Sequence, residues 1–395
     1  MKTNVGVFFG GRSVEHEISI ITSLQAMHAF NKDKYSITPI YVTKKGKWYS
    51  GEALMNVDNY KNMDALLKQC TEVYMAPEYG DFNVYKREVG MFGKKVYSTL
   101  DVAFIGFHGT NGEDGVFQGL IETIGIPFTG CNTVSSANGM DKIYMKMILK
   151  DSGVPVIDCV WFTDMQYKNS SDEIIKKIED KVPYPIIVKP ANLGSSVGIS
   201  KAANREELVK AIELASQFTS RIIAEKMIVK MKEINCSVLG DCDDCRASVC
   251  EEPIKSDDIL SYKDKYMGGS KSSKGMQSTT RRLPADLPDA TTKEIQHWAM
   301  ETFRVLSCNG VSRIDFIIDE AENKIYVNEI NTIPGSFSFY LWEATGVPFD
   351  KLNDTLIDLA LKRDRKNKMK VSSYDQNIFN IQGGFKTGGK LGTKR

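Results

Sequence analysis

The stretch that most constrains this chain is Val311–Asn331, VSRIDFIIDEAENKIYVNEIN, which predicts two strands joined by a short polar turn. Alternate residues of a strand share a face, so Arg313 and Asp315 point the same way on the first strand. For the same reason, Glu329 and Asn331 point the same way on the second strand. A hairpin of this kind therefore gathers charged and polar side chains in a short space.

With the turn centred near Ala321, Arg313 lies opposite Glu329 and all four polar side chains share one face. Two carboxylates and one amide oxygen on that face suit a hard cation such as Mg²⁺ or Mn²⁺, with phosphate oxygens and water as the other ligands. Arg313 is then available for a phosphate or a developing oxyanion. An exposed hairpin with solvated charges is the alternative interpretation of these residues alone.

The composition indicates two or three globular domains, because the chain has 395 residues and 42% of them are hydrophobic. The formal net charge of +1 gives no reason to expect nucleic acid or a membrane surface as a partner. No apolar run approaches the ~18 residues of a membrane helix. The apolar run in the opening MKTNVGVFFGG is too short for a signal peptide. Eight scattered cysteines favour the reducing cytoplasm.

Two of these cysteines, Cys242 and Cys245, form a C-x-x-C motif with Cys250 nearby. The motif lies in DCDDC, which we expect to be a turn between two strands. A zinc site needs a fourth ligand and usually a second pair, and the sequence offers no such partner. We therefore expect no metal or redox role for this motif.

The N-terminal segment predicts the start of a doubly wound α/β domain. Asn4–Gly10 is a buried strand that ends at Gly10-Gly11, and a helix with Ile18 and Ile21 on one side follows. Ligands of such domains bind beyond the carboxyl end of the strand, where Glu15 lies. A solvated carboxylate in the first helical turn is the alternative for this residue. The glycine pattern is not the dinucleotide fingerprint, so NAD is not expected.

A second buried strand, Asp101–Phe107, ends in His108–Gly115, HGTNGEDG, which we interpret as a loop of the functional site. A helix is then predicted from about Ser135 to Leu149, with Asp141 and Lys142 on it, and we place a domain boundary near its start.

A phosphate-binding turn is predicted after the strand Pro185–Pro190, which carries Lys189. The turn Ala191–Ser196 offers N–H groups, two hydroxyls and the charge of the lysine, although an ordinary hairpin turn has the same appearance. The strand Arg221–Met227 also ends in charged residues. Two such strand ends beside an apolar cleft would suit an adenine.

Two further segments look irregular. The polar stretch Ser256–Thr280 contains Lys265 and Tyr266 and is long for an unstructured loop, which is typical of a lid. The Gly- and Lys-rich tail Asn377–Arg395 is expected to be flexible.

Taken together, eight motifs resemble those of the D-alanine–D-alanine ligases, a family of the ATP-grasp superfamily. They stand in the family order: FFGGRSVEHEIS, HGTNGEDGVFQG, MDKIYMK, IIVKPANLGSSVGIS, AEKM, SYKDKYMGG, SRIDF and NEINTIPG. The resemblance runs from Asn4 to about Leu361. It implies an α/β and α+β protein with the three-domain ATP-grasp fold. We place a Rossmann-like N-terminal substrate domain at 1–134, a central ATP-grasp subdomain at 135–232, a C-terminal subdomain with the metal site at 233–370 and a flexible basic tail at 371–395.

The resemblance also implies roles for the residues that match these motifs. The implied ligands of two Mg²⁺ or Mn²⁺ ions are Asp315, Glu329 and Asn331. The implied holders of the ATP phosphates are Lys142, Lys189, Ser196 and Lys265, with Asn331 also near ATP. The implied adenine contacts are Glu225, Lys226 and Ile228, and the ribose contact is Glu233. The implied catalytic group comprises Glu15 for the ammonium of the first substrate, linked to Ser195 and Tyr266, and Arg313 for the oxyanion. His108 is implied to lie near the first substrate.

Two features depart from the family pattern. One extra residue separates Glu225 from Glu233, which weakens the ribose assignment. Many members carry a serine at the position of Tyr340 that helps to hold the carboxylate of the second substrate. Ser338 is an alternative donor for that carboxylate, and we also place Leu341 at this site. The FYLWE sequence resembles a branch that includes some vancomycin-resistance D-alanine–D-serine ligases.

The activity implied by the resemblance is ATP-dependent joining of two D-alanines through an acyl phosphate, for peptidoglycan precursor synthesis. A homodimer is common in this family. A D-alanine–D-serine ligase is the leading alternative, and a nucleotide-binding regulator without turnover is a second one. Tyr266 favours an amine over a hydroxy acid as second substrate, because a neutral phenol does not repel an ammonium group.

Overall fold

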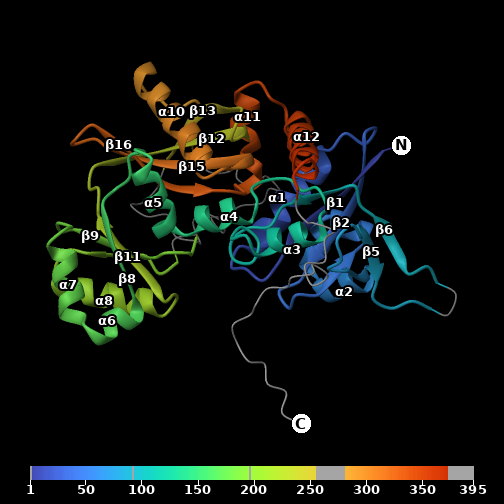
Figure 1. Cartoon of the computed structure of the whole chain (residues 1–395), viewed down its shortest axis with the longest axis horizontal. Helices are drawn as coiled ribbons and strands as arrows, with labels where there is room; N and C mark the ends of the chain where they lie inside the picture. The colour runs from blue at the N-terminus through green and yellow to red at the C-terminus, as the bar shows by residue number, and fades with distance from the viewer. Residues whose placement is uncertain (1, 91–92, 195–196, 255–280, 372–395) are drawn as a thin grey trace, which may run out of the picture.

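The computed structural model describes residues 2–90, 93–194, 197–254 and 281–371, which form three β-sheets (Figure 1). The predicted lid Ser256–Thr280, with Lys265 and Tyr266, lies outside the described residues. So do Ser195, Ser196 and the predicted flexible tail Asn377–Arg395. Among the described helices, none has both the length and the apolar character needed to span a bilayer.

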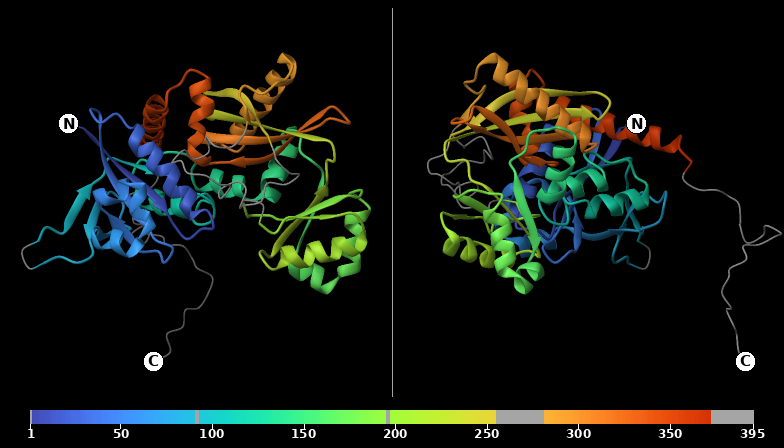
Figure 2. Two further views of the ribbon diagram at one scale, coloured as in Figure 1. Left: turned by 180° about the vertical axis from the view of Figure 1, so that it is seen from behind. Right: turned by 60° about the vertical axis from the view of Figure 1, so that its left-hand side comes forward.

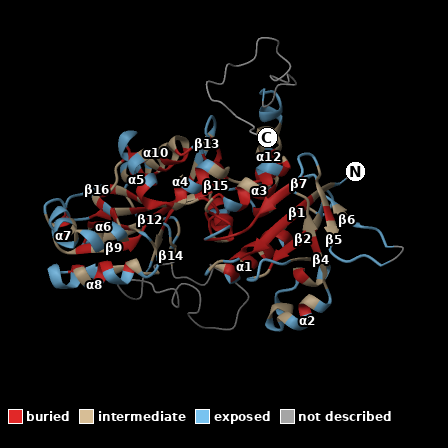
Figure 3. Ribbon diagram, turned by 60° about the horizontal axis from the view of Figure 1, so that its bottom comes forward, coloured by how far each residue is buried: buried red, intermediate tan, exposed pale blue. Residues whose placement is uncertain are grey.

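The first sheet has seven strands in the order β6-β5-β4-β3-β2-β1-β7. The strands are β1 Thr3–Gly10, β2 Tyr35–Val42, β3 Trp48–Ser50, β4 Thr71–Met75, β5 Asn83–Lys86, β6 Val96–Thr99 and β7 Val102–Ile105. The helical segments are α1 His16–Ala29, η1 Glu52–Met55, η2 Val57–Lys61, α2 Met63–Lys68 and α3 Val116–Ile124. β1 runs parallel to both β2 and β7, and these three strands are largely buried in Figure 3. The predicted strand, glycine turn and helix of an α/β opening are thus confirmed.

The second sheet has four antiparallel strands in the order β10-β9-β11-β8. Its strands are β8 Cys159–Thr163, β9 Ile186–Pro190, β10 Ser200–Ala202 and β11 Arg221–Lys226. The helices α6 Asp164–Asn169, α7 Ser171–Glu179 and α8 Arg205–Ser216 lie on its lower side in Figure 1. This sheet has a hydrophobic core of its own, formed with α7 and α8.

The third sheet has five strands in the order β14-β13-β12-β15-β16. They are β12 Met231–Asp241, β13 Cys245–Pro253, β14 Arg281–Arg282, β15 Asn309–Asp319 and β16 Lys324–Asn331. The helix α10 Asp289–Val305 covers one face with buried Ile295, Ala299 and Phe303. The chain continues through η4 Gly335–Ser338, α11 Phe339–Ala344 and α12 Phe349–Lys368.

The first and third sheets are joined by one hydrophobic core, to which α11 and α12 contribute. The ring of Phe337 packs edge-on against Phe104 at 5.0 Å. Arg363 of α12 donates to the carbonyl oxygens of Gly130 and Phe128, at 2.6 and 2.5 Å. Figures 1 and 2 show the second sheet and its helices set to one side of this joined body.

The sequence predicts one helix from Ser135 to Leu149, and this prediction is wrong in one respect. The segment forms two helices, α4 Thr133–Met140 and α5 Lys142–Asp151. They separate at Asp141, which is extended and caps α5 by accepting from the N–H groups of Ile143 and Tyr144. The N–H of Lys142 bonds the carbonyl of Ala191, a partner distant in the sequence. The break therefore places Lys142 in the first turn of α5, next to the end of β9.

Replacing Asp141 separates its two roles. Asp141→Ala removes both the cap and the ion pair with Arg221, and we expect it to lower the free energy of unfolding by about 1–2 kcal/mol. Asp141→Asn keeps an oxygen for the cap and loses only the charge, so it should cost clearly less. Denaturant unfolding of the two variants beside the wild type measures the difference, and equal losses would contradict the capping role.

Candidate active site

The hairpin β15–β16 has a different register from the one predicted. Asp315 pairs with Glu329, and Arg313 pairs with Asn331, so the expected pairing of Arg313 with Glu329 is wrong. The turn lies at residues 320–323 and contains Ala321 as predicted, but a bulge leaves Asn328 as an extra residue on β16 and shifts the pairing beyond it. Opposite residues share a face, so the shared face predicted for the four side chains is confirmed.

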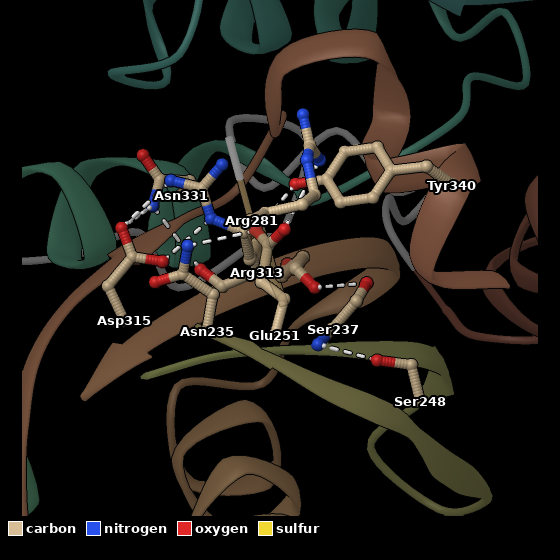
Figure 4. Close-up of polar contacts among 10 residues, drawn as sticks. Asn235, Ser237, Ser248, Glu251, Arg281, Arg313, Asp315, Asn331 and Tyr340 are labelled. Atoms are coloured by element: carbon tan, nitrogen blue, oxygen red, sulfur yellow. Dashed lines mark hydrogen bonds and ion pairs between the residues drawn. The ribbon is translucent and has the colours of Figure 1, made fainter. Parts of the chain in front are cut away.

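The polar row extends across the third sheet beyond the hairpin. Register partners run from Glu329 to Asp315, from Asp315 to Asn235 on β12, and from Asn235 to Glu251 on β13. Figure 4 shows Asn235 and Glu251 beside Arg313, Asp315 and Asn331. Sequence reasoning missed Asn235 and Glu251. Each of them stands next to a buried cysteine, Cys236 or Cys250, which indicates that it faces away from the core. That signal points to the site only once the strand pairing is known.

The two carboxylates of the predicted metal site each have a cationic partner. Arg313 donates from Nε and Nη2 to the two oxygens of Asp315 at 2.7 and 2.8 Å. The amide nitrogen of Asn331 donates to Asp315 at 3.0 Å. Lys142 Nζ lies 3.2 Å from Glu329 Oε2. Two cations that suit phosphate thus stand against two carboxylates that suit a metal ion.

A second ionic cluster joins the second and third sheets. Glu225 of β11 is buried and forms ion pairs with Lys146, at 2.8 Å, and with Lys189. Burial would raise the pKa of Glu225, but Lys146 and Lys189 outweigh it and lower that pKa to about 2. Lys189 also reaches Asn328, the bulge residue, at 3.5 Å. Lys146 was missed, although it follows Lys142 by four residues and so shares its helix face.

The other predicted nucleotide contacts lie near this cluster. Lys226 forms an ion pair with Glu322 at the tip of the hairpin, at 2.5 Å, and Ile228 is buried. Glu233 stands two residues before Asn235 on β12 and so lies on the same face of the third sheet. The second and third sheets therefore present their predicted ATP contacts toward one region.

Glu15 lies between two glycines of the predicted site loops. A Cβ placed on Gly109, where φ is +67°, would stand 2.9 Å from Glu15 Oε2. A Cβ on Gly194 would stand 3.2 Å from Glu15 Oε1. A larger residue at either glycine would crowd this carboxylate. The predicted partner Ser195 follows Gly194 directly and lies outside the described residues.

His108 is buried and contacts the chain rather than an open cavity. Its Nε2 lies 2.8 Å from the hydroxyl of Thr22, which in turn accepts from the N–H of Ser336 at 2.9 Å. Burial lowers the pKa of His108 to about 4, so this ring is neutral at pH 7. His108 therefore helps to connect α1 to the segment that follows Asn331.

Glu113, in the same loop, was not predicted. Its two oxygens accept from the N–H groups of Ile333, at 3.0 Å, and Gly109, at 3.2 Å. Burial first, and then the charge of Glu15, raise the pKa of Glu113 to about 8. An acidic side chain within the HGTNGEDG loop was the available signal.

The predicted contacts of the second substrate are all buried. Leu341 lies in the hydrophobic core, and the hydroxyl of Ser338 has no hydrogen-bond partner among the described residues. The hydroxyl of Tyr340 donates to Glu251 at 2.7 Å. Tyr340 therefore points along the sheet toward β13. Its hydroxyl does not lie where a serine hydroxyl at this position would reach a substrate.

The donor set for a metal ion is small. Within the described part of the chain, no three His, Cys, Asp or Glu side chains gather closely enough to hold an ion by themselves. Asp315 and Glu329, with the amide oxygen of Asn331, form an all-oxygen set that fits Mg²⁺ when phosphate oxygens and water complete it. Cys242 and Cys245 lie at the β12–β13 turn as free thiols.

The raised pKa of Glu113 predicts how stability depends on pH. The unfolded chain releases this proton near pH 4.5 and the folded protein only near pH 8, so the stabilisation is complete below pH 4.5 and is lost as the pH rises to 8. The wild type should therefore lose stability relative to Glu113→Gln over that range, by at most ~1.4 kcal/mol per pH unit. Denaturant unfolding at several pH values measures this, and a constant difference between the two proteins would contradict it.

Comparisons with known proteins agree with this arrangement. The family models described as D-ala D-ala ligase N-terminus and C-terminus match residues 4–131 and 148–358. The D-alanine–D-alanine ligase of Thermosipho melanesiensis is 39% identical over 96% of this chain and 99% of its own length. That of Acetivibrio thermocellus is 38% identical over 95% of this chain and 99% of its own length.

Two solved structures are similar along nearly the whole chain. The D-alanine-D-alanine ligase of Coxiella burnetii has a TM-score of 0.78 and 30% identity, covering 93% of this chain and 96% of that one. The VanG D-Ala:D-Ser ligase of Enterococcus faecalis has a TM-score of 0.77 and 31% identity, covering 91% of this chain and all of that one. The predicted α/β and α+β architecture of the ATP-grasp fold agrees with both. This chain belongs to the D-alanine–D-alanine ligase family.

Proposed function

We propose that this chain uses ATP to join two D-alanines into D-alanyl-D-alanine through an acyl phosphate, for peptidoglycan precursor synthesis. The observation that carries the proposal is the pairing of the Asp315 and Glu329 carboxylates with Arg313 and Lys142 on one sheet face. Such a set binds a metal–nucleotide complex by exchange, because the metal takes the carboxylates and the phosphates take the cations. The relatives at 36–39% identity support this activity.

Phosphoryl transfer needs positioning and charge neutralisation more than covalent chemistry. The first carboxylate attacks the γ-phosphate, which gives an acyl phosphate and ADP. Lys142 and Lys189 hold the phosphates, and Glu225 and Lys146 keep Lys189 in place. When bound at Asp315, Glu329 and Asn331, Mg²⁺ or Mn²⁺ neutralises phosphate charge.

The second step joins the amino acids. The neutral amine of the second D-alanine attacks the acyl carbon, and Arg313 stabilises the oxyanion that forms. That oxyanion collapses as the C–O bond to the phosphate breaks, so inorganic phosphate leaves and the amine nitrogen loses a proton. Glu15 binds the ammonium of the first D-alanine. In this proposal Ser195, Ser196, Lys265 and Tyr266 complete the site from outside the described residues, and Ser256–Thr280 closes over it to exclude water.

Further parts of the proposal concern the whole molecule. We infer two bound metal ions, a homodimer and a cytoplasmic protein, with small molecules as its ligands. The division at 1–134, 135–232 and 233–370 is supported by the three sheets: the first two lie within the first two ranges, and the third begins at Met231, two residues before the last range.

The main alternative is a D-alanine–D-serine ligase, supported by the 31% identity to the VanG structure. The higher identity to D-alanine–D-alanine ligases favours D-alanine as second substrate. A regulator without turnover is less well supported, because the chain retains every residue to which this proposal gives a metal or phosphate role among the described ones, namely Asp315, Glu329, Asn331, Lys142 and Lys189.

Removing one metal-binding carboxylate should abolish turnover. Glu329→Gln should lower kcat by several orders of magnitude, since metal stabilisation of the transferring phosphoryl group is worth several kcal/mol. Glu320→Gln, an exposed change at the tip of the same hairpin, should leave kcat unchanged. D-Alanine-dependent ADP release measures both variants. Near-normal turnover of Glu329→Gln would refute the metal assignment.

The second substrate can be identified by competition. With D-alanine, D-serine and D-lactate at neutral pH, we expect D-alanyl-D-alanine as the main product by mass. A pocket without a dedicated partner excludes the extra hydroxyl of D-serine only weakly, by roughly 10²-fold. A dominant D-alanyl-D-serine product would support the alternative. A dominant D-alanyl-D-lactate product would contradict the argument from the neutral phenol of Tyr266.

A further inference from the structure

The polar face of the third sheet ends at a second guanidinium. Arg281 stands on the edge strand β14 and donates from Nη1 to Glu251 Oε2 at 3.2 Å. Its Cζ lies 4.0 Å from the centre of the Tyr340 ring, in stacking distance. Figure 4 shows Arg281 beside Tyr340, on the same side of the sheet as Arg313. The site thus has two arginines and not one.

Glu251 holds this corner together. One of its oxygens accepts from Tyr340 at 2.7 Å and from the amide of Asn235 at 3.0 Å, and the other accepts from Arg281. The side chain of Glu251 is only 4% exposed. A buried carboxylate with three donors fixes their positions, because releasing any of them leaves a desolvated charge less well satisfied.

The phenol of Tyr340 has a structural task in this arrangement. A phenol can donate one hydrogen bond, and Tyr340 donates it to Glu251. Its ring meanwhile supports the guanidinium plane of Arg281. Tyr340 therefore acts as a platform, and a donor for a substrate carboxylate has to come from another side chain.

We propose that Arg281 binds the carboxylate of the second D-amino acid and so determines that the acceptor must carry one, with Glu251 and Tyr340 as positioning residues. This inference rests on the proposed ligase function. An arginine presents five N–H donors in a plane, which matches a carboxylate in a bidentate way. Arg313 is already assigned to the oxyanion on the other side of Glu251 and Tyr340. D-Alanine, D-serine and D-lactate all have the carboxylate, so Arg281 does not choose among them.

The test uses the full-length enzyme with D-alanine and D-alaninamide, an acceptor of the same shape without the negative charge. Arg281→Gln should raise the KM for D-alanine at the second site by about tenfold or more, the effect of losing a charge-assisted hydrogen bond. The KM values for ATP and for the first D-alanine should change less than about twofold. The preference for D-alanine over D-alaninamide should fall by the same factor. The control Arg282→Gln removes the neighbouring arginine, exposed and 3.5 Å from Glu252, and should alter none of these values.

Two further variants keep the test decisive. Arg281→Lys retains the charge beside Glu251 and protects folding, and it should lower the preference for D-alanine by a smaller factor, because lysine lacks the planar fork. Tyr340→Phe keeps the ring beside Arg281 and loses only one donor to Glu251, so it should lower that preference far less than Arg281→Gln does.

An unchanged preference in both Arg281 variants would overturn the proposal, as would an equal loss with both acceptors. If Tyr340→Phe lost as much of the preference as Arg281→Gln, the proposal would be overturned, because the phenol would then be the donor to the carboxylate. A wild type without D-alanine-dependent ADP release would instead refute the proposed function itself.

Discussion

The bulge at Asn328 is the constraint on which the rest of the site depends. Side chains alternate along a strand, so a shift of one residue moves every later side chain to the other face. Before the bulge, Val327 and Ile325 of β16 face the core under α10. After it, Glu329 and Asn331 face the same side as Asp315. One inserted residue thus moves Glu329 and Asn331 to the polar face while Ile330, between them, still faces the hydrophobic core. The bulge residue itself meets Lys189, which brings the second sheet to this point.

Around this row, the buried and half-buried charges of the site are paired. Asp315 pairs with Arg313, Glu329 with Lys142, Glu225 with Lys146 and Lys189, and Glu251 with Arg281. A buried charge without a partner would cost several kcal/mol, so such pairs keep the ligand-free fold stable. If a metal–nucleotide complex binds here as proposed, the dication would replace the cations at the carboxylates and the phosphates would replace the carboxylates at the lysines.

What could be predicted from the sequence was local. The alternation in SRIDF and NEIN places four polar groups on one face, and Lys189 at the end of a buried strand indicates a phosphate contact, because both patterns span only a few residues. The register of the hairpin could not be predicted, since the bulge depends on contacts with the core. The break at Asp141 depends on the bond from Lys142 to Ala191, a residue distant in the sequence. The roles of Tyr340 and Glu251 depend on a helix, α11, and a strand, β13, that meet only in the folded chain.

The segment between Asn331 and α11 depends on residues that are far away in the sequence. Ser336, Phe337 and Ser338 all have positive φ, at +54°, +51° and +51°, although none is glycine. Each such residue costs of order 1–3 kcal/mol, so the surrounding structure must compensate. The compensation comes from the first sheet: Thr22 accepts from the N–H of Ser336, and Phe104 packs against Phe337. His108 holds Thr22 in turn. The left-handed turn that positions Ser338 and Tyr340 is therefore stabilised by residues that come more than two hundred positions earlier, and the third sheet alone would not be expected to keep it.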